Sequence, residues 1–142
     1  MRDIQFRGKG LNGEWYHGNL AILKQKIDII EPGTYISNSA GLPFAYQVRP
    51  ETVGEFTGLY SPFADCGLGI YEQDILELFW EGHYPLYGIV EWKYPGWFIK
   101  AGNKTYAYGY EGFLCQSEEL KIIKILGNIF DDMALLLEKT NV

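Results

Sequence analysis

Alternating apolar and polar residues run through most of this 142-residue chain and predict short β-strands rather than helices. An alternating stretch at 3–9 and an apolar-rich stretch at 14–23 flank the dipeptide Asn12-Gly13. Asn-Gly suits the two positive φ angles of a type I′ turn, so we predict a β-hairpin that pairs 3–9 with 14–23.

The stretch from 26 to 50 is broken by Pro and Gly pairs and predicts several short strands. Six apolar or aromatic residues of this stretch are expected to face inward: Ile27, Ile29, Tyr35, Phe44, Tyr46 and Val48. A loop rich in Gly, Pro, Ser and Asp follows within 50–69. We therefore predict an N-terminal β-rich subdomain over 1–60 and a C-terminal one over 61–142, as separate units or as one compact domain.

The C-terminal half reads as a β-meander that ends in a helix. A strand at 74–82 is followed by shorter strands within 86–113, separated by turns at Pro95-Gly96 and Gly102-Asn103, and by a strand at 120–130. On the first strand, Leu76, Leu78 and Trp80 make the cleaner core face.

The last residues carry the spacing of an amphipathic helix. Asp132 is the expected N-cap, and Met133, Leu136 and Leu137 are expected to bury one face. The fold class is therefore α+β and predominantly β. It comprises an N-terminal hairpin or small sheet, a strongly bent antiparallel sheet or SH3-like barrel, and a short C-terminal helix.

Charge and composition narrow the choice of partners. The net charge of −6 and the lack of a basic run make nucleic acid an unlikely partner. The first ten residues lack the apolar core of a signal peptide, and no window approaches 18 apolar residues, so we expect a soluble, cytoplasmic protein that does not bind membranes. Its two cysteines are expected to be reduced.

Two carboxylates in the segment GIYEQDILEL, Glu72 and Asp74, are the first candidates for chemistry. Two residues apart on an extended chain, they would share one face and serve as an acid pair or a Mg²⁺ site. The favoured alternative is a turn in which Asp74 accepts backbone N–H groups and starts a strand. No third ligand or nucleophile lies nearby in the sequence.

Histidine and cysteine chemistry is weakly indicated. His17 and His83 lack metal-ligand spacing, and Cys66 and Cys115 lack an adjacent base in the sequence. We therefore predict no cofactor, no metal and no catalytic residue.

Aromatic residues, 16% of the chain, supply the candidate binding surface. Tyr and Trp are enriched at protein interfaces, although they also fill small β-cores. We predict an interface, most simply for self-association into a homo-oligomer, formed by Trp92, Tyr94, Trp97, Tyr106, Tyr108 and Tyr110. Stacking of single-stranded nucleic-acid bases on these rings is an alternative that the acidic net charge disfavours.

Four segments resemble the YopX family of phage and prophage proteins, in the same order along the chain. They are IQFRGKGLNGEWYHGNL, VRPETVGEFTGLY, IYEQDIL and IKILGNIFDD. Two departures concern a loop and a single residue. The segment YSPFADCGLG is longer and less charged than its family counterpart, and Gln73 stands where the family has Gly. A Gly there would suit a positive φ, so Gln73 implies either an ordinary backbone angle or tolerated strain.

This resemblance implies a β-rich, phage- or prophage-encoded protein that acts in the cytoplasm of a bacterial host, and it supplies no catalytic residues. The leading hypothesis is a non-enzymatic binding or assembly factor with a host or phage protein partner. The alternatives are a metal-dependent or acid/base enzyme that uses Glu72 and Asp74, with help from His83, and a single-stranded nucleic-acid binder.

Overall fold

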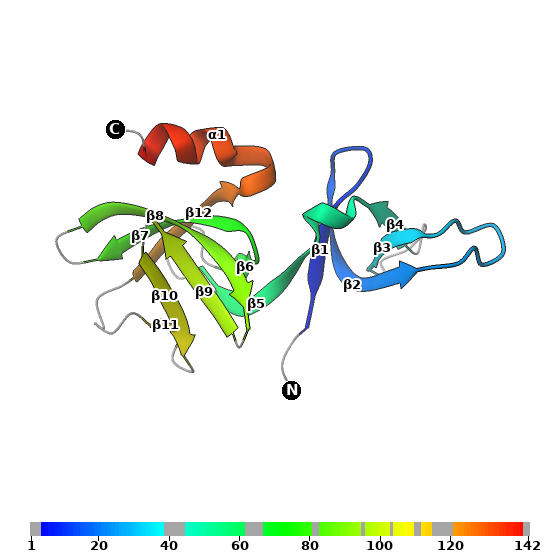
Figure 1. The fold of residues 1–142 in the computed structure, drawn as a ribbon, viewed down its shortest axis with the longest axis horizontal. Coiled ribbons are helices and arrows are strands. Elements are labelled where there is room, and N and C mark those ends of the chain that lie inside the picture. The colour runs from blue at the N-terminus through cyan, green and yellow to red at the C-terminus, as the bar shows by residue number, and fades with distance from the viewer. Residues whose placement is uncertain are drawn as a thin grey trace. The chain divides into compact units, whose positions relative to one another are not determined.

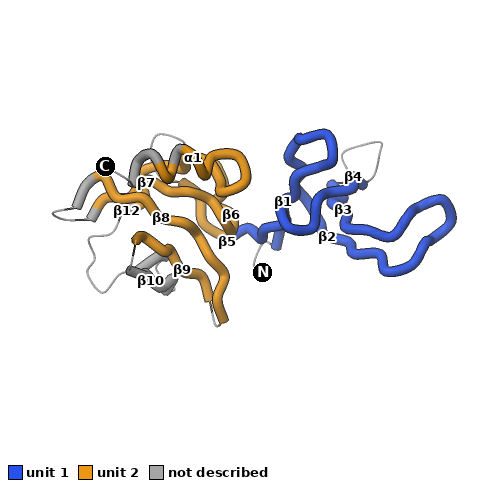
Figure 2. The backbone as a smooth tube through the Cα atoms, turned by 45° about the horizontal axis from the view of Figure 1, so that its top comes forward, with its two compact units in different colours: residues 1–56 blue, residues 57–142 orange. Residues whose placement is uncertain are grey.

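A computed structural model places the chain in two compact units, residues 1–56 and 57–142 (Figure 2). The structure describes residues 4–38, 45–61, 67–80, 83–94, 96–102, 104–109, 112–114 and 121–140. The division falls four residues before the boundary predicted at 60, because β5 (Gly54–Tyr60) begins in the first unit and ends in the second.

Unit 1 is a small antiparallel sheet with hydrogen-bonded order β4-β3-β2-β1-β5 (Figure 1). Its elements are β1 (Phe6–Lys9), β2 (Trp15–Leu23), β3 (Gly33–Ser37), β4 (Ala45–Val48) and the 3-10 turn η1 (Pro50–Thr52). The end of β1 also meets β4 through a bridge between Gly10 and Val48 and an Arg49 N–H bond to the Lys9 carbonyl (2.9 Å). This contact joins β1 to β4, so the sheet formed by β1 to β4 closes on itself.

Close approach of β1 to β4 explains Gly8. A Cβ at Gly8 would lie 2.8 Å from a Val48 methyl group, closer than real side chains come. Val48 and Ile36 are buried at the centre of the unit, and the rings of Tyr16 and Tyr46 stack with centroids 4.0 Å apart. Glycine on β1 therefore lets the sheet close around a small core.

The hairpin of β1 and β2 is confirmed, but its turn is not type I′. The Gly13 N–H bonds to the Gly10 carbonyl (3.0 Å), and Gly13 has φ +86°, whereas Asn12 does not have a positive φ. This is the pattern of a three-residue loop, in which a turn is followed by a left-handed Gly. Asn12 acts through its side chain, which accepts the Glu14 N–H (3.1 Å).

The inward-facing set predicted for 26–50 is partly wrong. Val48 is buried, and Tyr46 pairs with buried Ile36. Ile27 and Ile29, in contrast, are 56% and 85% exposed, because they lie in the connection between β2 and β3 rather than on a core strand. Tyr35 is only partly buried, since it alternates with buried Thr34 and Ile36, and Phe44 lies outside the described residues.

Unit 2 contains the predicted meander. Its six-stranded antiparallel sheet has the order β11-β10-β9-β8-β7-β12 (Figure 1), and the end of β5 pairs with β6. The strands are β6 (Gly69–Tyr71), β7 (Asp74–Trp80), β8 (His83–Lys93), β9 (Gly96–Ala101), β10 (Lys104–Gly109), β11 (Gly112–Leu114) and β12 (Lys121–Asn128). The fold class, predominantly β with one short C-terminal helix, is confirmed.

One face of this sheet carries the main core. Leu76 and Leu78 of β7, predicted as core, pack with Val90, Trp97 and Ile99, all at most 4% exposed. The opposite face carries α1 (Ile129–Thr140), under which Ile75 is fully buried. In the part of the chain that the structure describes, no helix is long and apolar enough to span a membrane.

The helix begins earlier than predicted, at Ile129, and its N-cap is Asn128. The Asn128 side-chain oxygen accepts the N–H groups of Phe130 (3.0 Å) and Asp131 (3.1 Å). Asp132, the predicted cap, instead lies at a kink (φ −127°, ψ 15°), where its carboxylate accepts the Asn128 N–H (3.1 Å).

We predict that Asn128→Ala lowers the free energy of unfolding by about 1 kcal/mol, because two N–H groups lose their acceptor. Asn128→Ser is the matched control, since a serine oxygen accepts the same bonds, and it should keep most of the stability. Urea unfolding followed by circular dichroism measures both variants. Equal losses in the two would show that Asn128 acts by packing and not by capping.

Candidate functional site

The turn between β6 and β7 fixes one corner of the candidate site. Tyr71 and Asp74 flank Glu72 and Gln73, and the Asp74 carboxylate accepts the Tyr71 N–H (2.8 Å). Asp74 is only 1% exposed. The structure therefore favours the turn interpretation of the carboxylate pair, in which Asp74 binds backbone and starts β7.

Gln73 carries backbone strain. Its φ is +71°, one of two positive φ values among the described non-glycine residues. A negative φ at Glu72 followed by a positive one is the sign pattern of a type II turn, which prefers Gly at the second position. Of the two possibilities left open by the sequence, tolerated strain is the one observed.

Backbone bonds hold Gln73 in this conformation. Its N–H donates to the Val90 carbonyl of β8 (2.7 Å), and its carbonyl accepts the N–H of Ile129, the first residue of α1 (3.1 Å). The Gln73 side-chain oxygen is buried and has no hydrogen-bond partner among the described residues. Strained backbone and an unsatisfied buried group are costs that proteins retain mainly at functional positions.

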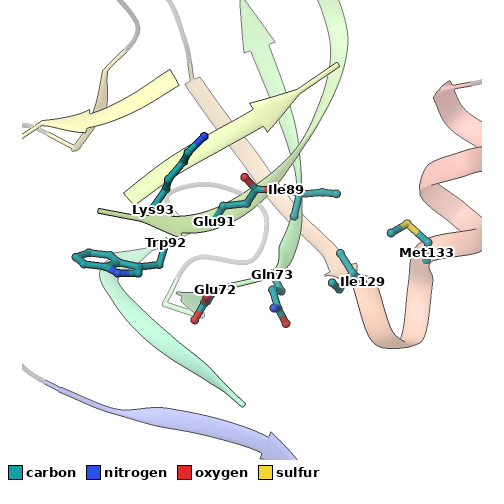
Figure 3. A pocket seen from close by; sticks show the side chains of 8 residues that line it. All are labelled: Glu72, Gln73, Ile89, Glu91, Trp92, Lys93, Ile129 and Met133. Atoms are coloured by element: carbon teal, nitrogen blue, oxygen red, sulfur yellow. The ribbon is translucent and has the colours of Figure 1, made fainter. Parts of the chain in front are cut away.

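A hollow of about 520 Å³ opens beside this turn, a volume within the range of ligand pockets. Figure 3 shows its side chains coming from the β6–β7 turn, β8 and the start of α1. We call it the helix groove, lined by Glu72, Gln73, Ile89, Glu91, Trp92, Lys93, Ile129 and Met133. A second hollow of about 270 Å³ shares Ile89 and Glu91 with it and reaches Leu136 and Leu137 farther along α1.

The groove explains why the predicted buried face of α1 is only partly buried. Leu136 is 9% exposed, but Met133 and Leu137 are 38% and 53% exposed. All three line the two hollows between α1 and β8. The helix therefore contributes apolar side chains to an open surface as well as to the core.

The predicted aromatic interface is divided by the structure. Trp97 is 4% exposed and belongs to the core, so its assignment to an interface is wrong. Trp92 pairs with it across β8 and β9, with ring centroids 5.1 Å apart, and is 46% exposed. Because the two rings share the core face of the sheet, the Trp92 ring points away from α1 (Figure 3). Tyr94 is 89% exposed. Tyr110 and the side chains of Tyr106 and Tyr108 lie outside the described residues.

The structure separates the proposed acid pair, because Glu72 lines the groove and Asp74 does not. Glu91, which sequence reasoning did not single out, supplies the second carboxylate of the groove. In the sequence, Glu91 is one of several polar residues that alternate with apolar ones along a strand. Its place in the groove depends on where α1 packs, which the local sequence does not indicate. No cluster of three metal-ligating side chains occurs within the described ranges. The His83 side chain and Cys66 and Cys115 lie outside them.

His17, the other histidine considered, lies in unit 1 opposite Arg7 in the pairing of β1 and β2. Partial burial, followed by the charge of Arg7, lowers the pKa of His17 below 6.5. The Arg7 guanidinium is in turn held 5.0 Å from the centre of the Trp15 ring. This set lies in unit 1 and contributes no residue to the helix groove.

Comparison with protein-family models finds no match, and neither do comparisons with curated proteins or with solved structures. The resemblance to the YopX family therefore stays a prediction.

The strain at Gln73 predicts an inverted order of stability for small replacements. Gln73→Gly should be more stable than Gln73→Ala by about 1 kcal/mol, because only Gly adopts a left-handed φ without a steric penalty. Thermal unfolding measures both variants. At Glu72, where φ is negative, the order should reverse and the Ala variant should be the more stable. An Ala variant at position 73 as stable as the Gly variant would contradict a strained turn.

The pKa of His17 predicts a pH dependence. A histidine whose pKa is lowered by folding contributes stability that is fully present above pH 6.5 and is lost as the pH falls below it. The melting temperature should therefore fall more between about pH 7.5 and pH 5.5 in the wild type than in His17→Gln. Asn19→Gln, two residues further along the same strand and without a titratable group, should behave as the wild type. Identical pH dependence in His17→Gln and the wild type would refute the assignment.

Proposed function

We propose that this protein is a non-enzymatic binding or assembly factor whose helix groove receives a protein partner. The observation that carries the proposal is the open, largely apolar hollow between α1 and β8, where Met133 is 38% exposed beside Ile89 and Ile129. Apolar side chains buried in a well-formed hollow supply much of the binding energy at protein interfaces.

The shape and chemistry of the groove suit a protein segment. Its apolar lining comes from Ile89, Ile129 and Met133, and its polar lining from Glu72, Glu91 and Lys93. Apolar anchors with charged residues beside them are the usual composition of such interfaces. The resemblance to the YopX family supports a phage or prophage origin and action in the bacterial cytoplasm.

Backbone strain at Gln73 is consistent with this role. The turn joins β8 to the first residue of α1, and so fixes the distance between the two walls of the groove. A preformed groove loses little conformational entropy when a partner binds.

We expect a photo-reactive amino acid at position 133 to form a discrete covalent adduct in bacterial cells that express the full chain. The same amino acid at Leu68, which is also exposed in unit 2 but outside the groove, is the matched control and should form none. Mass spectrometry of the adduct identifies the partner.

Glu91→Lys should weaken the adduct formed from position 133, because it reverses a charge in the groove. A smear of adducts at both positions, or none at position 133, would contradict a groove that binds a protein.

A further inference from the structure

A second unusual surface lies in unit 1, at the connection between β2 and β3, which projects beyond the other elements of that unit (Figure 2). Four isoleucines are exposed there within nine residues of sequence. We call this segment, residues 22–31, the arm tip; its isoleucines are Ile22 (61% exposed), Ile27 (56%), Ile29 (85%) and Ile30 (45%). So dense a group of exposed aliphatic side chains marks an interaction site.

The arm tip is a built structure. Ile27 and Ile30 exchange two backbone hydrogen bonds (3.0 and 2.9 Å) around Asp28 and Ile29. Asp28 has φ +56°, the only positive non-glycine φ among the described residues besides that of Gln73. A positive φ at the first central residue and not at the second is the sign pattern of a type II′ turn, which points Ile29 outward from a fixed frame.

Polar groups at the base of the arm tip are paired locally. Lys26 forms an ion pair with Glu31 (3.2 Å), and the Tyr35 hydroxyl donates to the Glu31 carbonyl (2.7 Å). These bonds fix the turn without covering the isoleucines. A rigid, protruding apolar group needs a complementary hollow rather than a flat surface.

The helix groove of unit 2 has the complementary features. It is hollow and apolar where the arm tip is protruding and apolar. Its two carboxylates, Glu72 and Glu91, are opposite in charge to Lys24 of the arm tip, whereas Lys26 is already paired with Glu31. Lys93 in the groove similarly matches Asp28. Charges of opposite sign on the two surfaces favour and orient such a contact.

We propose that the arm tip of one copy of this chain binds in the helix groove of a second copy, with Ile29 as the anchor. This inference rests on the proposed function and names the partner as the protein itself. The two surfaces differ, so the contact is head-to-tail: one copy keeps a free groove and the other keeps a free arm. Repetition of such a contact yields a closed ring, of which a reciprocal dimer is the smallest, or an open filament.

The test uses two variants that each lose one surface. Ile29→Asp removes the arm anchor, and Met133→Glu places a charge in the groove; both positions are exposed, so both variants should fold as the wild type by circular dichroism. Light scattering after gel filtration should show that the molar mass of the wild-type particle increases with protein concentration. Each variant alone should be monomeric, with self-association weakened on the order of 30-fold or more, as for a central interface residue.

Mixing the two variants is the decisive step. Ile29→Asp keeps its groove and Met133→Glu keeps its arm, so an equimolar mixture should form a heterodimer and stop there. Leu11→Asp and Leu68→Glu, which add charge at other exposed apolar positions of the two units, should associate as the wild type does.

Three results would overturn the proposal. They are a wild type that stays monomeric at all concentrations, a mixture that stays monomeric although the wild type associates, and retention of monomeric wild type on phosphatidylglycerol vesicles through Ile29. A mixture that stays monomeric would mean that the wild type associates through a symmetric contact. Retention on the vesicles through Ile29 would mean that the isoleucines bind a lipid surface. An adduct from position 133 with a different protein would keep the proposed function and reject this inference.

Discussion

The backbone bonds of Gln73 are the constraint on which the rest of unit 2 depends. Its N–H is held by Val90 in the middle of β8, and its carbonyl holds Ile129 at the start of α1. One residue thus joins the sheet to the helix. This conformation is energetically unfavourable, because Gln73 has a left-handed φ although it carries a side chain. The Asp74 carboxylate stabilises the same turn by accepting the Tyr71 N–H.

The helix groove follows from this junction. Because α1 starts at the turn and is capped by Asn128, its first residues are fixed against β8, and Ile75 is buried beneath the helix. Met133 and Leu137 nevertheless remain exposed above the strand. A second strained turn, at Asp28 in the arm tip, likewise lies beside exposed apolar side chains. Both strained positions thus lie on the two surfaces that we propose to meet.

Local sequence patterns were sufficient for much of the fold and for little of the site. Alternation and turn dipeptides gave the first hairpin, the meander and the helix, because these depend on near neighbours. The inward or outward direction of Ile29 and Trp97 depends on which strands pack on them, so the sequence misassigned both. The groove joins residues 72, 91 and 133, which no local pattern relates. The turn at 71–74 was predictable from Asp74 as an acceptor of backbone N–H groups, because that interaction is local.

The location of Ile29 in the assembled protein tests the central claim most directly. A photo-reactive amino acid at position 29 of a nitrogen-15-labelled chain, mixed with unlabelled chains and illuminated, reports which peptide of the other copy lies beside the arm tip. Our account predicts labelled arm peptides joined to unlabelled peptides from 87–94 and 129–137. Linkage to the arm of the other copy, or to strands far from α1, would contradict it.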